Sequence, residues 1–103
     1  MAEKKNGIIQ QYYNYKQLKR EYFCFNGKKE GVHKIYYDDG QLDIISNYKN
    51  NIREGEYKEY YANGQLYIIF NWKNDKVEGE YKSYYRKGKL MEKYNFKNGK
   101  IEK

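Results

Sequence analysis

The feature of this sequence that most limits its fold is an internal repeat with a period of 24 residues. Residues 54–66 read EGEYKEYYANGQL, and residues 78–90, one period later, read EGEYKSYYRKGKL. A fixed period of this length is typical of repeat architectures, in which each unit packs mainly on its neighbours. We therefore expect a single repeat domain over residues 1–103, built from four blocks without gaps: residues 6–29, 30–53, 54–77 and 78–101.

Each block contains two turn signals that separate runs of about eight residues. The first signal ends in glycine, and the second is rich in Asn, Asp and Gly. These residues tolerate the positive φ of two-residue hairpin turns, so we expect a tight hairpin at each signal. In the first block Tyr15-Lys16 occupies the position of the glycine, which predicts a wider or less ordered turn. The signals are Asn26-Gly27, Asp39-Gly40, Asn50-Asn51, Asn63-Gly64, Asn74-Asp75, Lys87-Gly88 and Asn98-Gly99.

The run that follows the first turn alternates with a period of two residues, which is typical of a strand. The alternation predicts one face with Leu66, Ile68, Phe70 and Trp72, and an opposite face with Tyr67, Ile69, Asn71 and Lys73. The predicted fold is all-β: tandem antiparallel β-hairpins, with about eight strands in one elongated, twisted and open meander sheet. Because no helix is expected to cover this sheet, it should be one layer deep, with aromatic side chains along its concave side.

The composition supports a folded chain that depends on tyrosine. Leu, Ile, Val and Phe make up only 19 of 103 residues, but 15 Tyr and one Trp can bury large apolar areas. The start of the chain has no apolar stretch of the kind found in signal peptides, and no apolar run is long enough to span a membrane. The lone Cys24 and lone His33 argue against disulfides, metal clusters and histidine-dependent catalysis. We expect a cytoplasmic protein that is not an enzyme and has no cofactor or metal.

The third block reads Gly-x-Tyr-Lys-x-Tyr-Tyr-x-Asn-Gly-x-Leu, followed by Asn-x-Lys-Asn-(Gly/Asp/Asn)-Lys-x-Glu-Gly, and the other blocks follow this pattern with substitutions. This pattern resembles the MORN repeat, in the variant form found in multi-copy bacterial proteins described as antitoxin-like. The resemblance is strongest in the third and fourth blocks and weakest in the first. It implies tandem β-hairpins and a role as a protein-binding or assembly module, with lipid-headgroup binding proposed for some members.

The blocks differ in charge, and this difference predicts a contact surface. The net charge of the four blocks is +4, −1, −1 and +4, which contributes to a total of +7. Charged residues that differ between blocks gather near the first turns, so we expect a partner protein with its own charge pattern to bind that edge. Lysines at the ends could equally prevent the open sheet from pairing with other molecules. The predicted contact residues are Tyr15, Lys16, Lys19, Arg20, Asp38, Asp39, Asp43, Arg86, Lys87 and Lys89.

Other recurring side chains have both a functional and a structural interpretation. The first tyrosines of the pairs, Tyr12, Tyr36, Tyr60 and Tyr84, could stack nucleic-acid bases, but a residue present in every period is expected to build the repeat. Recurring glutamates could suggest glycosidase chemistry, but they are expected to form cross-strand pairs with Lys58 and Lys82. Cys24 and His33 are expected to pack in the core. The glutamates are residues 54, 56, 59, 78 and 80.

Taken together, these patterns predict a non-catalytic protein-binding module. The most specific hypothesis is a small antitoxin-like inhibitor from a bacterium or phage that occludes a partner protein, with a nuclease of a toxin or phage-defence system as one candidate target. The first alternative is a nucleic-acid-binding protein that uses the basic terminal repeats and the tyrosine platform. The second alternative is a structural homo-oligomer formed through the open sheet edges.

Overall fold

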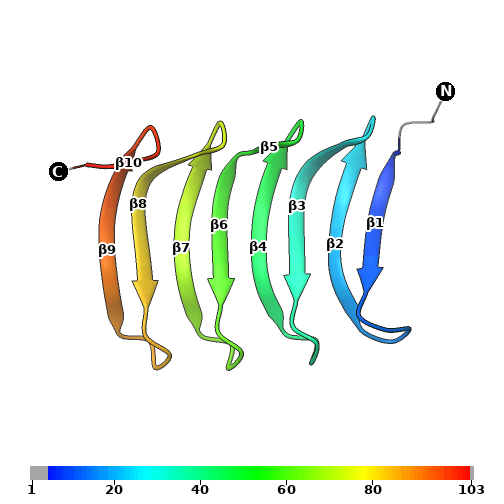
Figure 1. Cartoon of the computed structure of the whole chain (residues 1–103), viewed down its shortest axis with the longest axis horizontal. Coiled ribbons are helices and arrows are strands. Elements are labelled where there is room, and N and C mark those ends of the chain that lie inside the picture. Colours follow the sequence, from blue (N-terminus) through cyan, green and yellow to red (C-terminus); the bar gives the residue numbers. More distant parts are fainter. Residues whose placement is uncertain (1–4, 103) are drawn as a thin grey trace.

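The computed structural model describes residues 5–102 and confirms the all-β fold. One open antiparallel sheet runs in the order β1-β2-β3-β4-β6-β7-β8-β9-β10, with the short β5 paired to β4 (Figure 1). Residues 1–4, which begin the segment expected to lack a signal peptide, and residue 103 lie outside the described residues. The strands are β1 (Gly7–Tyr12), β2 (Leu18–Phe25), β3 (Lys28–Tyr36), β4 (Leu42–Lys49), β5 (Ile52–Arg53), β6 (Gly55–Tyr60), β7 (Leu66–Lys73), β8 (Lys76–Tyr84), β9 (Leu90–Lys97) and β10 (Lys100–Ile101).

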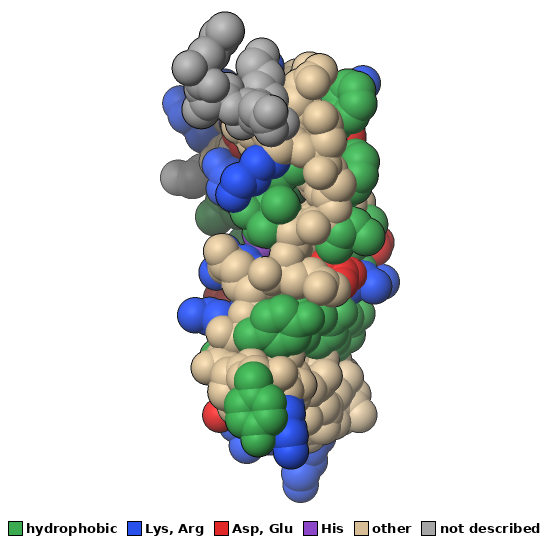
Figure 2. Space-filling model, turned by 90° about the vertical axis from the view of Figure 1, so that its right-hand side faces the viewer, with side chains coloured by type: hydrophobic (Ala, Val, Ile, Leu, Met, Phe, Trp, Pro, Cys, Tyr) green, Lys and Arg blue, Asp and Glu red, His purple; other side chains and the backbone are tan. Residues whose placement is uncertain are grey.

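The sheet is a single layer, as the sequence predicts. Its Cα atoms extend 49 × 33 × 14 Å, and Figure 2 shows the thin slab from its β1 edge, where exposed hydrophobic side chains lie among Lys and Arg. Burial is correspondingly limited: Phe70 keeps 8% of its surface exposed although it is the largest buried hydrophobic side chain. Cys24 and His33 are buried, which confirms that they pack inside the sheet. The other buried residues in the described chain are Ser46 and Ser83.

The second turn of each repeat has the predicted hairpin geometry. Both central residues have positive φ, as in Asn50 (55°) and Asn51 (72°), or Asn74 (49°) and Asp75 (67°). This is the backbone of a type I′ turn, whose twist matches that of the flanking strands. The preference of Asn, Asp and Gly for left-handed backbone therefore fixes this edge of the sheet.

The first turns are longer than predicted. The backbone N–H of Tyr61 donates to Gln65 O at 2.9 Å, so the loop contains three residues, and only Gly64 adopts a positive φ (89°). A three-residue loop that ends in a left-handed glycine is the next common hairpin connection. The turn of the first repeat is not wider than the others, because Tyr13 N donates to Gln17 O at 2.9 Å across a loop of the same length, although none of its three central residues adopts a positive φ.

A β-bulge in every hairpin changes the predicted faces. Glu59 pairs with Ile68, but Tyr60 pairs with Leu66, so Tyr67 is an extra residue in its strand. Since paired residues point to the same side of a sheet, the bulge moves Leu66 to the face opposite Ile68. The prediction that this leucine shares a face with Ile68, Phe70 and Trp72 is therefore wrong. We call the side that carries Ile68, Phe70 and Trp72 the aromatic face, and the side that carries Leu66 the leucine face.

Tyrosine hydroxyl groups connect each repeat to the next at the first-turn edge. Tyr13 Oη donates to Tyr36 O at 2.7 Å, and Tyr61 Oη donates to Tyr84 O at 2.7 Å. Tyr37 Oη makes the equivalent hydrogen bond to Tyr60 O. In the first three repeats, the second tyrosine of the pair therefore binds the backbone of the first tyrosine in the following repeat.

Glutamates connect the opposite edge, where they accept hydrogen bonds from the second turns. Glu54 Oε1 accepts from Asn74 N at 2.9 Å, and Glu30 and Glu78 make the equivalent bonds in their own repeats. Stacked turns are also bonded, as where Asp75 N donates to Arg53 O at 3.0 Å. The expected cross-strand pairing of Glu54 and Glu78 with lysines is therefore wrong, because these carboxylates hold the turns.

The lysine pairs involve two other glutamates and lie mainly along single strands. Lys58 Nζ lies 3.3 Å from Glu56 Oε1, and Lys82 Nζ lies 2.9 Å from Glu80 Oε1, each pair within one strand. Glu80 also makes a cross-strand pair, in which Lys93 Nζ lies 3.2 Å from its Oε2. Lys58 and Lys82 therefore do pair with glutamates, but along a strand and not across strands as predicted, and the cross-strand partner of Glu80 is Lys93.

Replacing Tyr37 by Phe should destabilise the sheet while keeping its ring in place. The substitution removes the hydroxyl that binds Tyr60 O, and a hydrogen bond of this type contributes about 1 kcal/mol to the free energy of unfolding. Tyr85→Phe is the matched control, because Tyr85 is the equivalent residue of the fourth block and, within the described residues, its hydroxyl makes no bond like those of Tyr13, Tyr37 and Tyr61. Urea unfolding should show a loss of stability only for Tyr37→Phe, and equal losses for both variants would contradict this role.

Candidate functional site

A row of aromatic rings crosses the aromatic face, with one position on each of seven neighbouring strands. The ring centroids of Tyr57 and Phe70 lie 4.5 Å apart, and those of Phe70 and Tyr81 lie 5.6 Å apart, both nearly parallel. The row continues to Tyr94, whose ring centroid lies 6.1 Å from that of Tyr81. In strand order from β2 to β9 without β5, the row consists of Tyr22, His33, Ser46, Tyr57, Phe70, Tyr81 and Tyr94.

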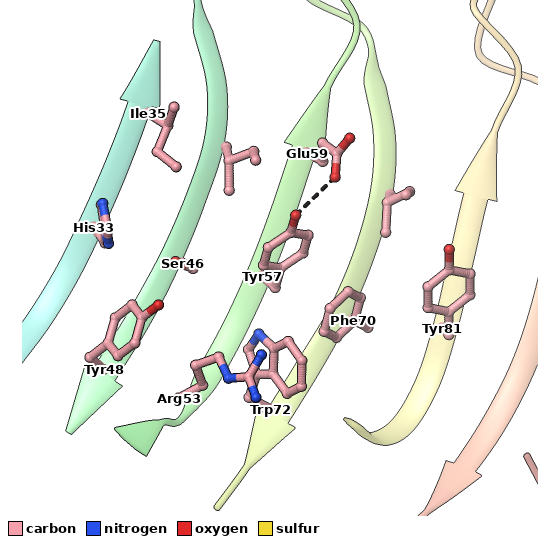
Figure 3. A pocket seen from close by; sticks show the side chains of 12 residues that line it. His33, Ile35, Ser46, Tyr48, Arg53, Tyr57, Glu59, Phe70, Trp72 and Tyr81 are labelled. Atoms are coloured by element: carbon pink, nitrogen blue, oxygen red, sulfur yellow. Dashed lines mark hydrogen bonds between the residues drawn. The ribbon is translucent and has the colours of Figure 1, made fainter. Parts of the chain in front are cut away.

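Ser46 interrupts this row. It pairs directly with His33 on β3, and the register that pairs Ile45 with Lys58 brings it next to Tyr57 on β6. Figure 3 shows the short Ser46 side chain on β4 between the His33 and Tyr57 rings. The row therefore consists of an N-terminal group of rings and a C-terminal group of rings, separated at β4.

The interruption forms the floor of a groove with a volume of about 380 Å³. His33 and Ile35 line one side, and Tyr57 and Phe70 line the other. The groove lies within the exposed aromatic face and combines an apolar lining with a few polar groups, which is the usual chemistry of a binding pocket. We call it the Ser46 groove.

Two charged residues lie at opposite ends of the Ser46 groove, and each already has a partner (Figure 3). Arg53 places its guanidinium carbon 4.1 Å from the ring centroid of Trp72, while its Nε lies 2.9 Å from Asp75 Oδ1. Glu59 Oε1 accepts a hydrogen bond from Tyr57 Oη at 2.8 Å. The bonds from Arg53 lower the pKa of Asp75, whereas burial and the bond to Glu59 raise the pKa of Tyr57.

His33 is held neutral beside this groove. Burial, together with the positive charges of Lys29 and Arg20, lowers its pKa to about 4. Its ring packs between Tyr22 and Tyr48, with centroid distances of 4.9 and 5.7 Å. Among the residues that the structure describes, its buried Nε2 has no hydrogen-bond partner.

Four of the ten predicted contact residues take part in local interactions or strand pairing within the sheet. Asp39 Oδ1 accepts from Gln41 N at 3.0 Å and so holds its own turn. Burial raises the pKa of Asp43, and the neighbouring Tyr37 hydroxyl lowers it in part. Arg20 pairs with Ile35 and thus lies on the aromatic face, away from the turn loops. Lys89 closes its loop through a backbone bond, in which Tyr85 N donates to Lys89 O at 2.7 Å.

The remaining predicted residues lie near the first-turn edge with exposed side chains. Tyr15 is 87% exposed, and Lys16 Nζ lies 5.2 Å from its ring centroid. Lys19 lies over the ring of Tyr13, and Arg86 lies over the ring of Tyr61. Asp38 and Lys87 complete this exposed set. The turn edge therefore brings together charges from the first, second and fourth repeats, but not Arg20.

The alternative tyrosine platform lies on the leucine face. Tyr60 pairs across its hairpin with Leu66, and the other first tyrosines pair with the equivalent leucines. Tyr60 O also accepts the hydroxyl bond from Tyr37, so this residue helps to join two repeats. The remaining members of this set are Tyr12, which is 50% exposed, and the half-buried Tyr36 and Tyr84.

Sequence reasoning missed the importance of Ser46, Arg53 and Glu59. The signal for Ser46 was present, because the other three repeats have Tyr22, Phe70 and Tyr94 at the same position. No periodic signal marks Arg53 or Glu59 as neighbours of a groove. The positions of Arg53 and Glu59 depend on the break at Glu54, which separates β5 from β6.

These observations define an open β-hairpin repeat protein with an exposed, grooved aromatic face. The family model described as MORN repeat variant matches residues 29–50, 53–74 and 77–98, and the chain belongs to this family. MORN repeats are generally protein-binding or membrane-binding modules. Searches of curated proteins and of solved structures found no match. In the described part of the chain, no helix is long and apolar enough to cross a membrane, and no three His, Cys, Asp or Glu side chains cluster as a metal site.

His33→Phe should weaken the acid sensitivity of the fold. The native state keeps His33 neutral down to about pH 4, whereas the unfolded chain protonates it near its ordinary pKa of 6.5. The unfolded state therefore binds more protons within this interval, so the free energy of unfolding falls as the pH decreases through it. Urea unfolding between pH 7 and about pH 4 should show a smaller decrease for His33→Phe than for the wild type. His33 is the only histidine, so parallel curves would contradict this assignment.

Proposed function

We propose that this protein is a non-catalytic module that binds a partner protein on its aromatic face. The observation that carries the proposal is the Ser46 groove, which opens between two groups of rings on the aromatic face. Large aromatic side chains in preformed hollows are the usual energetic centres of protein interfaces. Rings held by strand pairing are rigid before binding, so little side-chain entropy is lost when a partner covers them.

The charges around the groove favour a protein partner over a nucleic acid. The guanidinium of Arg53 is bonded to Asp75, and Glu59 adds a negative charge at the other end. Nucleic-acid binding depends on cations that are available to neutralise phosphates. A nearly balanced groove suits the mixed surface of a protein better.

We further propose that the module is a small antitoxin-like inhibitor that acts in the cytoplasm of a bacterium or phage-infected cell and occludes its target. The resemblance to antitoxin-like MORN proteins supports this role, and a nuclease of a toxin or phage-defence system is the candidate target. The exposed charges at the first-turn edge would then form the polar rim of the interface, where they set specificity and the rate of association. This rim consists of Tyr15, Lys16, Lys19, Asp38, Arg86, Lys87 and Lys89, with Arg20, Asp39 and Asp43 behind it.

Affinity capture from the native cell lysate tests the proposal. Half of each sample is treated with nuclease and washed in high salt, and the expected result is one stoichiometric protein that survives this treatment. Capture that disappears with nuclease would contradict the proposal and favour the nucleic-acid alternative, because phosphate contacts weaken steeply with salt. Capture of additional copies of the bait alone, confirmed by light scattering, would favour the homo-oligomer instead.

A charge-reversed bait tests the rim. Asp38→Lys should weaken capture several-fold without changing the unfolding midpoint, because Asp38 lies in an exposed loop. Asp39 stays native, since its carboxylate holds the turn. The control is Lys49→Glu, an exposed charge reversal at the opposite end of a strand. If the two variants capture the target equally well, the first-turn edge is not part of the interface.

A further inference from the structure

Ser46 is an exception to the repeat at the centre of the aromatic face. The same position of the 24-residue period is Tyr22 in the first repeat, Phe70 in the third and Tyr94 in the fourth. Each of these side chains belongs to the row of rings, whereas Ser46 contributes only a hydroxymethyl group. The second repeat thus lacks the ring that the architecture accommodates everywhere else.

The missing ring leaves aromatic neighbours on both sides. His33 pairs with Ser46 on one side, and Tyr57 lies next to it on the other. Adjacent strands lie about 4.8 Å apart, and neighbouring rings of this row are separated by comparable distances, such as 4.5 Å between Tyr57 and Phe70. A planar ring seated over Ser46 would therefore contact both neighbours at ordinary stacking distances.

The walls of the groove also hold polar atoms that are not satisfied within the protein. His33 is only 4% exposed, and in the described residues its Nε2 lacks a hydrogen-bond partner, as does the buried Nε1 of Trp72. Both residues line the Ser46 groove. Buried polar groups are normally hydrogen-bonded, and of these two residues His33 is the one that pairs directly with Ser46. A phenol hydroxyl can donate as well as accept, so it suits either tautomer of the imidazole.

We propose that the Ser46 groove is the receptor for one tyrosine side chain of the partner protein. Its ring completes the aromatic row, and its hydroxyl bonds Nε2 of His33, the unpartnered nitrogen on the strand next to Ser46. This inference rests on the proposed protein-binding function and names the chemistry of its anchor. A nucleobase would offer a similar plane, but Arg53 is already bonded to Asp75 and the neighbouring Glu59 would repel a phosphate.

The protein contains its own reporters for a direct test. Trp72 is the only tryptophan and His33 the only histidine, and both line the groove. Titration with 4-methylphenol, followed by Trp72 fluorescence and the NMR signals of His33, should show saturable, weak binding. Cyclohexanol, which has a hydroxyl but no aromatic plane, should bind at least tenfold more weakly. Equal effects of the two compounds would overturn the proposal, and so would tighter binding of uridine or adenosine.

Two substitutions of Ser46, one that fills the groove and one that leaves it open, form a matched pair of variants. Ser46→Phe introduces the ring found in the third repeat, so it should keep the unfolding midpoint at or above that of the wild type and reduce phenol binding at least tenfold. Ser46→Ala leaves the groove open and should bind like the wild type. If Ser46→Phe does not fold, Ser46→Leu fills the groove with a smaller side chain. Undiminished phenol binding in a folded, filled variant would overturn the proposal.

The same variants separate this inference from the proposed function. In the affinity capture, the Ser46→Phe bait should lose the partner while the Ser46→Ala bait retains it. Capture that is equal for the wild type and Ser46→Phe would overturn the tyrosine receptor but leave the protein-binding function intact. Failure of the wild type to capture any protein would overturn the proposed function itself, and the partner's tyrosine with it.

Discussion

A sheet that is one layer thick has no opposing layer to hold its strands together, so this structure depends on hydrogen bonds between neighbouring repeats. At one edge, the second tyrosine of the first three pairs binds a carbonyl of the next repeat, as Tyr61 does with Tyr84. At the other edge, the stacked turns are bonded to one another, as Asp75 N is to Arg53 O, and glutamates such as Glu54 hold each turn within its own repeat. Both kinds of bond link positions that recur in every period. Their recurrence explains why a chain with so few aliphatic residues maintains a regular sheet, because each repeat is fixed at both ends before its faces are covered.

Because hydrogen bonds at the two edges join the repeats, the side chains of the aromatic face are only partly needed to stabilise the fold. The rings of Tyr57, Phe70 and Tyr81 stabilise one another along the row. Phe70 is buried, whereas Tyr57 and Tyr81 are half-buried, and the described chain forms one sheet with no second layer over them. Their exposed area is therefore available to a partner without loss of the bonds that define the fold. The charged groups beside them are bonded locally, as Arg53 is to Asp75, and this limits the desolvation that binding requires.

Much of the fold could be predicted from the sequence because its strongest signals are local. Turn residues with positive φ, such as Asn50-Asn51, and the period-two alternation are properties of short segments. The bulge could not be predicted in this way, since alternation assumes continuous pairing, and the extra residue at Tyr67 reverses the side of Leu66. The role of Glu54 was also missed, because its turn lies 20 residues away along the chain. For the site, charge patterns indicated the turn edge, but only the three-dimensional register showed that Ser46 separates His33 from Tyr57.

The positions at which one repeat departs from the others indicate where function lies. A position that serves only the architecture should be equivalent in all repeats, and changes that weaken packing need another explanation. On the aromatic face, the second repeat has His33 where the third and fourth have Tyr57 and Tyr81, and it has Ser46 where the others have a ring. Both changes reduce the stability of the fold. Because His33 is buried as a neutral imidazole, the free energy of unfolding decreases as the pH falls, and Ser46 lacks the contacts that a ring would make. These two weakened positions are paired with each other and line the same groove. Such a concentration of unfavourable exceptions at one point of a regular sheet is typical of a binding site, because a site requires the hollow that optimal packing would fill.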